Sequence, residues 1–335
     1  MDLADIAEHD LVSAAAAKAI GIDAAGLRQR LRAGVTRRVI RGWYAVWAPG
    51  VDRPPWQGED VHDTARRRHR LLVLALLRSF EGRVVASHQS ALVLHGVALW
   101  QADLATAHVC RSTTDHTRHR NSAVIHPETG VDPVATEDGF RTVPIAHAVV
   151  QVGLYPPDSF ARRTPMDSLI AADHALHHGK LTARELEVAV EAHSHHAGIP
   201  AVRALLAHAD GRHESPGETR LAHSLRRLGY DFTPQVPLPG GYFGDFGLDG
   251  EDVVVEFDGL GKYDAATSGA AAGTALARRQ NLAAEKKREE DIRRGSGTEF
   301  ARFLWSEADN LPLIRDRVES ARARARARAR GQRPA

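Results

Sequence analysis

The sequence predicts a multi-domain α/β protein, and three observations support this prediction. The chain has 335 residues, which exceeds one typical domain and favours two or three. Residues 1–48 contain three short helical segments followed by a hairpin, whereas residues 211–311 alternate helical and strand-like segments. The hydrophobic share of 43% and the charged share of 26% are those of a folded protein, which excludes a disordered chain.

Composition also indicates the cellular compartment of the protein and the classes of partner that it excludes. Cys110 is the only cysteine, which excludes an internal disulfide and indicates a reducing compartment. The longest apolar run, residues 71–77, is too short to cross a bilayer, and the acidic N-terminus lacks a signal-peptide pattern. We therefore expect a cytoplasmic protein with no membrane partner.

The N-terminal segment has the order of a winged helix-turn-helix, for which we predict residues 1–48. Asp2, Ser13 and Asp23 are typical N-cap residues, and each precedes a helical segment. A hairpin with strands at 35–40 and 43–47 follows. In such domains the last helix enters the major groove and the hairpin arginines hold phosphates; the alternative is that the arginines only solubilise the domain. The predicted DNA-binding residues are Arg28, Arg30, Arg32, Arg37, Arg38 and Arg41.

Two motifs add a family resemblance. Residues 37–44, RRVIRGWY, fit a basic R-x-x-x-R-G-x-Y hairpin, and residues 87–96 read SHQSALVLHG. Both resemble AbiEi-family antitoxins of type IV toxin–antitoxin systems. The second motif falls in a central α/β and helical region that we predict at 58–210. The resemblance implies promoter binding and a nucleotidyltransferase-like toxin as a partner.

Histidines raise the question of a metal site in the central region. His88 and His95 are seven residues apart, on one face of a helix, but no third ligand has a convincing spacing. We expect both to cap and pack. A later group lacks the tight paired spacing of zinc sites, and we expect strands with surface histidines there. Its members are His108, Cys110, His116, His119 and His126.

The richest chemistry lies in residues 245–263, DFGLDGEDVVVEFDGLGKY. The run 253–255 is an uninterrupted β-branched strand pattern, and Asp249-Gly250 predicts a two-residue hairpin turn before it. Strand alternation puts Glu256 and Asp258 on one face, and Asp245 begins the preceding segment. Three carboxylates beside one hairpin repel each other, so the pattern predicts a divalent cation.

This stretch resembles the PD-(D/E)XK nuclease core, in the branch related to very-short-patch repair endonucleases. The resemblance covers about 215–311, within a nuclease-like domain at 211–311, and consists of a helix, a hairpin, a second helix and a strand at 299–305. It implies that Glu218, Asp245 and Glu256 hold Mg²⁺ or Mn²⁺. The implied catalytic residues are Asp245, Glu256, Asp258, Lys262 and Lys286.

One departure from that family leaves two functions open. The general pattern has Lys two residues after the acid, where this chain has Asp258, although the related branch often carries E-x-D-G. The first hypothesis is a DNA-binding protein with a metal-dependent endonuclease domain, in which Lys262 or Lys286 supplies the positive charge. The alternative is an AbiEi-like antitoxin or transcriptional regulator whose nuclease-fold domain is inactive.

The last segment, 312–335, is an arginine-rich tail. Within it, residues 320–335, SARARARARARGQRPA, alternate Ala and Arg and place arginine on every face of a helix, so we expect no apolar stripe for packing there. The tail is then either a solvated helix extension or disordered. It either adds salt-sensitive affinity for nucleic acid or has no role.

Overall fold

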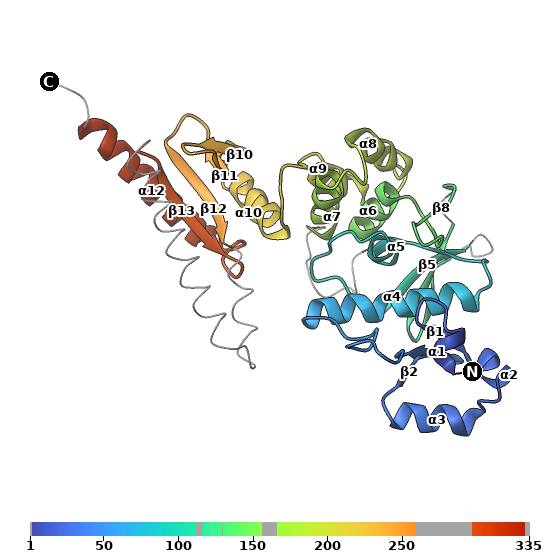
Figure 1. Cartoon of the computed structure of the whole chain (residues 1–335). Coiled ribbons are helices and arrows are strands. Elements are labelled where there is room, and N and C mark those ends of the chain that lie inside the picture. The colour runs from blue at the N-terminus through green and yellow to red at the C-terminus, as the bar shows by residue number, and fades with distance from the viewer. Residues whose placement is uncertain (1, 112–115, 129, 156–165, 259–296, 332–335) are drawn as a thin grey trace. The chain divides into compact units, whose positions relative to one another are not determined.

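The computed structural model describes residues 2–111, 116–128, 130–155, 166–258 and 297–331. The fold is mixed α/β, as predicted, and the chain divides into two compact units, residues 1–209 and 210–335 (Figure 1). We call these the first and the second unit. Within the described residues, no helix has the length and apolar character needed to span a membrane.

The first unit begins with the predicted capped helices. The side chains of Asp2, Ser13 and Asp23 accept backbone N–H bonds at the starts of α1 (Leu3–Ile6), α2 (Ala14–Ala19) and α3 (Ala24–Arg32). The predicted hairpin is also confirmed, as β2 (Thr36–Ile40) and β3 (Trp43–Val46). A further strand, β1 (Leu11–Ser13), pairs with β3. We did not predict it, because three residues are too few to show a strand period.

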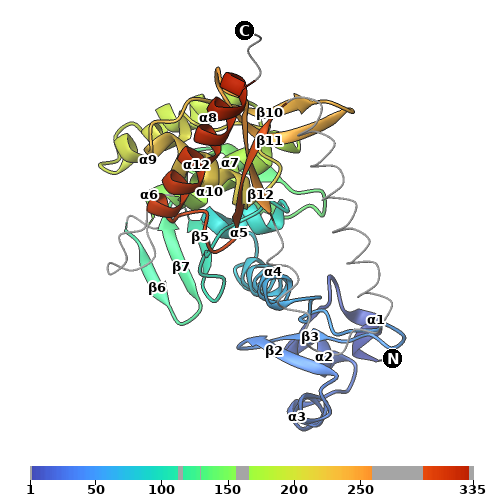
Figure 2. The same ribbon diagram turned by 90° about the vertical axis from the view of Figure 1, so that its left-hand side faces the viewer.

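Helix α4 (Val61–Ser79) is buried on two sides. One side packs on Leu11 and Ala45 of the small N-terminal sheet, and the other side packs on the larger central sheet. This double burial explains why residues 71–77 are all apolar. Figures 1 and 2 both show α3 on the side of the small sheet that lies away from α4.

The central sheet has the strand order β6-β7-β5-β4-β9-β8. Its strands are β4 (Val85–Ala86), β5 (Ala107–Arg111), β6 (Arg118–Arg120), β7 (Ala123–Pro127), β8 (Val134–Ala135) and β9 (Arg141–Thr142). The helices that follow β4 and β9 are α5 (His88–Leu94), α6 (Ile145–Leu154), α7 (Met166–His177), α8 (Ala183–Ala192) and α9 (Ile199–Leu206). They share one apolar core that includes Leu92, Val149 and Leu186.

The second unit contains a four-stranded sheet in the order β10-β11-β12-β13. Its described elements are α10 (Pro216–Arg227), β10 (Phe232–Leu238), β11 (Tyr242–Leu248), β12 (Val253–Asp258), β13 (Glu299–Leu304) and α12 (Leu311–Gly331). Neighbouring strands are antiparallel except β12 and β13, which are parallel. The predicted helix, hairpin and final strand are confirmed. The predicted second core helix, with Lys286, and the residue Lys262 lie outside the described residues.

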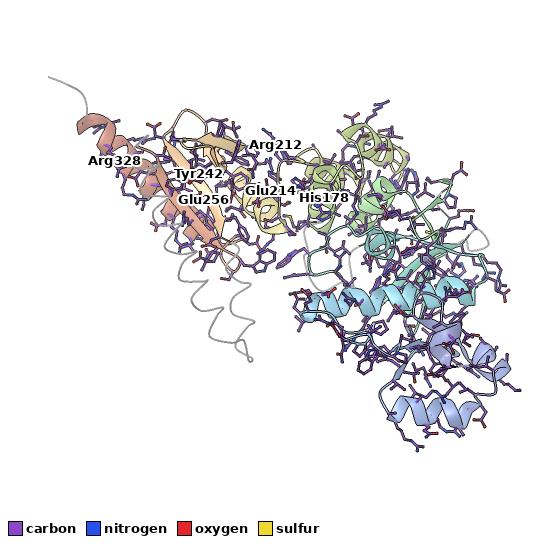
Figure 3. All side chains as sticks on the ribbon, viewed as in Figure 1. His178, Arg212, Glu214, Tyr242, Glu256 and Arg328 are labelled. Carbon is purple, nitrogen blue, oxygen red and sulfur yellow. The ribbon has the colours of Figure 1, made fainter. Side chains whose placement is uncertain are left out.

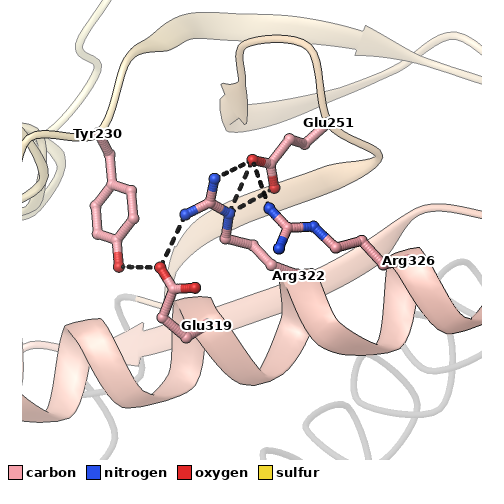
Figure 4. A network of polar contacts seen from close by, with 5 residues as sticks. All are labelled: Tyr230, Glu251, Glu319, Arg322 and Arg326. Atoms are coloured by element: carbon pink, nitrogen blue, oxygen red, sulfur yellow. Dashed lines mark hydrogen bonds and ion pairs between the residues drawn. The ribbon is translucent and has the colours of Figure 1, made fainter.

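The tail was expected to lack a packing face, and this expectation is wrong. In the Ala-Arg stretch, Ala321 is buried and Ala325 packs against the core of the second unit. Alanine is apolar enough to extend the stripe that Ile314 and Val318 begin on α12. Arginines flank the stripe and pair with acids. Arg322 donates from Nε to Glu251 at 2.8 Å and from Nη1 to Glu319 at 2.8 Å, and the Tyr230 hydroxyl also donates to Glu319 (Figure 4).

Candidate functional site

The predicted carboxylates come from three adjoining elements of the second unit. Glu218 lies in the first turn of α10, Asp245 on β11 and Glu256 on β12. Phe246 on β11 pairs with Val255 on β12, so Asp245 and Glu256 are the next residues along the two strands. Asp245 is fixed to the neighbouring strand, because its Oδ2 accepts the Phe257 N–H at 2.6 Å. Figure 3 labels Glu256 on β12.

A close contact positions the start of α10 against β12. A Cβ added at Gly217 would lie 2.0 Å from the Phe257 ring, so only glycine fits there. Glu218, the next residue, is held by its own helix terminus. Its Oε1 accepts the Ser215 hydroxyl at 2.7 Å, and its Oε2 accepts the Glu214 N–H at 2.9 Å. The capping sequence therefore fixes this carboxylate before any ligand binds.

The electrostatics of the cluster favour a cation. Burial, together with the nearby carboxylates of Glu218, Glu256 and Glu214, raises the pKa of Asp245 to about 7, and the Phe257 N–H bond opposes this rise. Burial also raises the pKa of Glu218. The neighbouring acids therefore disfavour the charged form of Asp245, and a bound cation relieves repulsion of this kind.

Convergence of the carboxylates is incomplete. Glu256 pairs with Arg302 on β13, Nη2 to Oε2 at 2.8 Å, because the parallel register sets these two residues side by side. Within the described ranges, the carboxylates of Glu218, Asp245, Glu256 and Asp258 do not form a group of three with oxygens within 4.8 Å of one another. Asp258 follows Glu256 on the same face of β12, as predicted from strand alternation.

Arg302 is a site residue that the sequence reasoning missed. Its only sequence signal is its place in EFARFL, a strand already predicted. Its role depends on which strand pairs with β12 and in which register, and neither follows from local pattern. Lys262 and Lys286 lie outside the described residues, whereas Arg302 is a described cation in contact with Glu256.

The raised pKa of Asp245 predicts a pH-dependent stability. A carboxyl group with a pKa of about 7 in the folded state and 3.8 otherwise binds its proton more tightly when folded. The free energy of unfolding therefore falls as pH rises from about 4 to about 7. In EDTA, we expect Asp245→Asn to exceed the wild type in stability by about 1–3 kcal/mol at pH 8 and to match it near pH 4. Urea unfolding across this range measures the difference, and a gap that is constant with pH would contradict the prediction.

The arginines predicted to bind DNA lie on α3 and the β2–β3 hairpin, and most are accessible. The exposed ones are Arg28, Arg32, Arg37, Arg38 and Arg41. Arg30 is partly buried and pairs with Asp2 at 3.6 Å. Burial and the nearby positive charge of Arg68 lower the pKa of Arg37. Positive charges gathered in this way favour an anionic partner.

The expectation of surface histidines in the central sheet is wrong for two of them. His108 on β5 and His126 on β7 are buried, and both contact the buried His88. Alternating positions on paired parallel strands placed them on one face, and that pairing was not predictable from spacing. His95 packs as expected, with Nε2 2.7 Å from the Thr142 hydroxyl. Cys110 is buried, and burial raises its pKa to about 11, so it is not a nucleophile.

Comparisons with known proteins add no family to this picture. A scan of the sequence against models of protein families finds no match, and a search of curated proteins finds no similar protein. The two family resemblances therefore rest on the quoted motifs, and what they imply about function stays a prediction.

Proposed function

We propose that the chain is a DNA-binding protein whose second unit hydrolyses phosphodiester bonds with Mg²⁺ or Mn²⁺. The observation that carries this proposal is the Asp245 carboxylate. It is partly buried, fixed by a backbone N–H bond, and raised in pKa to about 7 by burial and the neighbouring acids. A site with a purely structural role gains nothing from such repulsion, whereas a cation site needs it.

The donor set fits a hard divalent cation, because carboxylate oxygens are the ligands that Mg²⁺ prefers. Asp245, Glu218 and Glu256 would hold it. When bound, such a metal polarises the phosphate and lowers the pKa of a bound water. The chain supplies the orientation: Ser215 and the Glu214 N–H hold Glu218, and the Phe257 N–H holds Asp245.

In this proposal, Arg302 stabilises the negative charge that develops on the reacting phosphate. The family pattern has a lysine at the position of Asp258, and Arg302 supplies a positive group on the neighbouring strand instead. A guanidinium has several N–H donors in a planar fork, which suits the oxygens of a phosphate. It would leave Glu256 for the phosphate when substrate binds, and Asp258 would accept a proton beside it.

The first unit would hold the duplex. Exposed arginines on α3 and on the β2–β3 hairpin provide phosphate contacts, and α3 lies on the outer side of the small sheet (Figure 2). The order of capped helices and basic hairpin supports a winged-helix mode of binding.

The second candidate is a transcriptional regulator or antitoxin whose nuclease-like unit is inactive, with a nucleotidyltransferase-like toxin as its partner. The Glu256–Arg302 ion pair favours this candidate. An arginine that stays on Glu256 neutralises one proposed ligand and leaves a cation less charge to bind.

Supercoiled plasmid separates the two candidates. The enzyme predicts nicking or linearisation with Mg²⁺ or Mn²⁺ and none in EDTA. If the protein is a regulator, we expect tight binding of one operator that is independent of metal, with no cleavage under any condition.

Replacing Arg38 and Arg41 together by alanine should weaken binding of all DNA sequences and reduce the salt dependence of binding by up to about two counterions.

A further inference from the structure

We propose that His88, His108 and His126 form a zinc site in the first unit, independent of the acidic cluster. The three side chains come from the start of α5, from β5 and from β7. One ring nitrogen of each lies within 4.8 Å of the others, and all three residues are buried. In the part of the chain that the structure describes, this is the group of potential ligands that meets this spacing.

The backbone sets the convergence. Strands β5 and β7 are parallel, and Cys110 pairs with His126, so His108 and His126 lie two positions apart on the same face of the sheet. His88 is placed above that face by a positive φ of 50°, a conformation that costs free energy for any residue with a side chain. Gln151 accepts its N–H at 3.1 Å and holds it there.

The three rings pack closely, and nitrogen atoms of two of them share a hydrogen bond that a metal would replace. His108 Nδ1 lies 2.9 Å from His126 Nε2, and the rings of His88 and His126 stack with centroids 4.0 Å apart. A tetrahedral zinc with three imidazole ligands places their nitrogens about 3.4 Å apart, so an ion requires an opening of about half an ångström at that hydrogen bond. The Ser87 hydroxyl, 3.0 Å from His88 Nδ1, leaves the Nε2 atom of that ring for the metal.

The chemistry of the donors selects the metal. Imidazole nitrogens suit Zn²⁺, Co²⁺ or Ni²⁺ and do not suit Mg²⁺ or Ca²⁺, which prefer oxygen. Burial keeps the three rings unprotonated, which is the form that binds a metal. A water molecule would complete four-coordination. The Tyr155 ring packs edge-on against the three rings, with centroids 5.0–5.5 Å away. Bound zinc would tie α5 to both strands.

Metal binding to the full chain, purified without a histidine tag, tests the proposal. After EDTA treatment, reloading with Zn²⁺ and dialysis, we expect one Zn²⁺ per chain by elemental analysis, unchanged by excess Mg²⁺. With Co²⁺ in place of Zn²⁺, we expect the wild-type protein to show the intense visible absorption of a tetrahedral site. His88→Gln and His126→Gln should each weaken Zn²⁺ affinity by at least about 100-fold.

A matched histidine provides the control. His119 lies exposed on the neighbouring strand β6, so His119→Gln should keep full zinc affinity. Wild-type protein that binds Co²⁺ with only the weak spectrum of an octahedral ion, or binds no zinc, would overturn the proposal. So would zinc affinity that is equal in the wild type and the His88 and His126 variants. Because the acidic cluster lies in the other unit, these results are separate from any nuclease result.

Discussion

Asp245→Asn and Glu256→Gln are each expected to reduce metal-dependent plasmid nicking by about 100-fold or more, since each removes one charge from the proposed cation site. The Asp245 variant keeps an oxygen that accepts the Phe257 N–H, so the strand geometry is preserved. The loss should appear in the rate at saturating DNA, because in this proposal the first unit holds the DNA. Initial rates of supercoiled plasmid conversion, at fixed Mn²⁺, measure it.

The control is Asp249→Asn, which makes the same chemical change in the exposed turn of the same hairpin. It should retain full activity.

The Arg302→Met variant distinguishes the two candidate functions. If Arg302 stabilises the reacting phosphate, this variant binds the metal at least as tightly and cleaves more slowly. If Arg302 only blocks the site, the variant gains metal-dependent cleavage that the wild type lacks.

Gly217→Ala is expected to destabilise the second unit by about 3 kcal/mol, although alanine normally favours a helix over glycine by about 1 kcal/mol. The added methyl would lie 2.0 Å from the Phe257 ring, so the ring or the helix must move. Since Glu218 and Asp245 are held on either side of this contact, nicking should fall as well. Chemical denaturation of the full chain measures the change when it is followed by tryptophan fluorescence, in which Trp305 beside Phe257 is the tryptophan that the second unit contributes.

A second substitution tests the cause. Phe257→Leu removes the ring and should recover part of the stability lost in Gly217→Ala, giving a favourable coupling energy in a double-mutant cycle. The control is Gly331→Ala in α12, where no atom lies within 4 Å of the added methyl. It should be neutral or slightly stabilising. Equal destabilisation by both glycine substitutions, or no coupling with Phe257, would contradict the packing account.

Sequence predicted the local features of this chain because local rules govern them. The caps at Ser13 and Asp23, and the chain reversal at Asp249-Gly250, depend on neighbouring residues alone. The predicted two-residue length of that hairpin is wrong, because four residues separate Leu248 of β11 from Val253 of β12. The placement of acidic residues on α10, β11 and β12 followed from the same reasoning together with a family resemblance.

Features that depend on strand pairing could not be predicted. Arg302 contacts Glu256, and His108 contacts His126, because of the registers of two pairs of parallel strands. The paired strands lie far apart in sequence or are joined by irregular connections. Register is set by the whole packed core and leaves no periodic signal. The tail was misjudged for a related reason, since Ala321 becomes a core residue only where a sheet is available to cover it.

The central claim is that a divalent cation binds between Asp245, Glu218 and Glu256. Anomalous diffraction from crystals of the full chain grown with Mn²⁺ tests it most directly. The account predicts one Mn²⁺ peak about 2.2 Å from carboxylate oxygens of Asp245 and Glu256, with Arg302 moved away from Glu256. Absence of Mn²⁺ density at these side chains, with Arg302 still paired to Glu256, would contradict it.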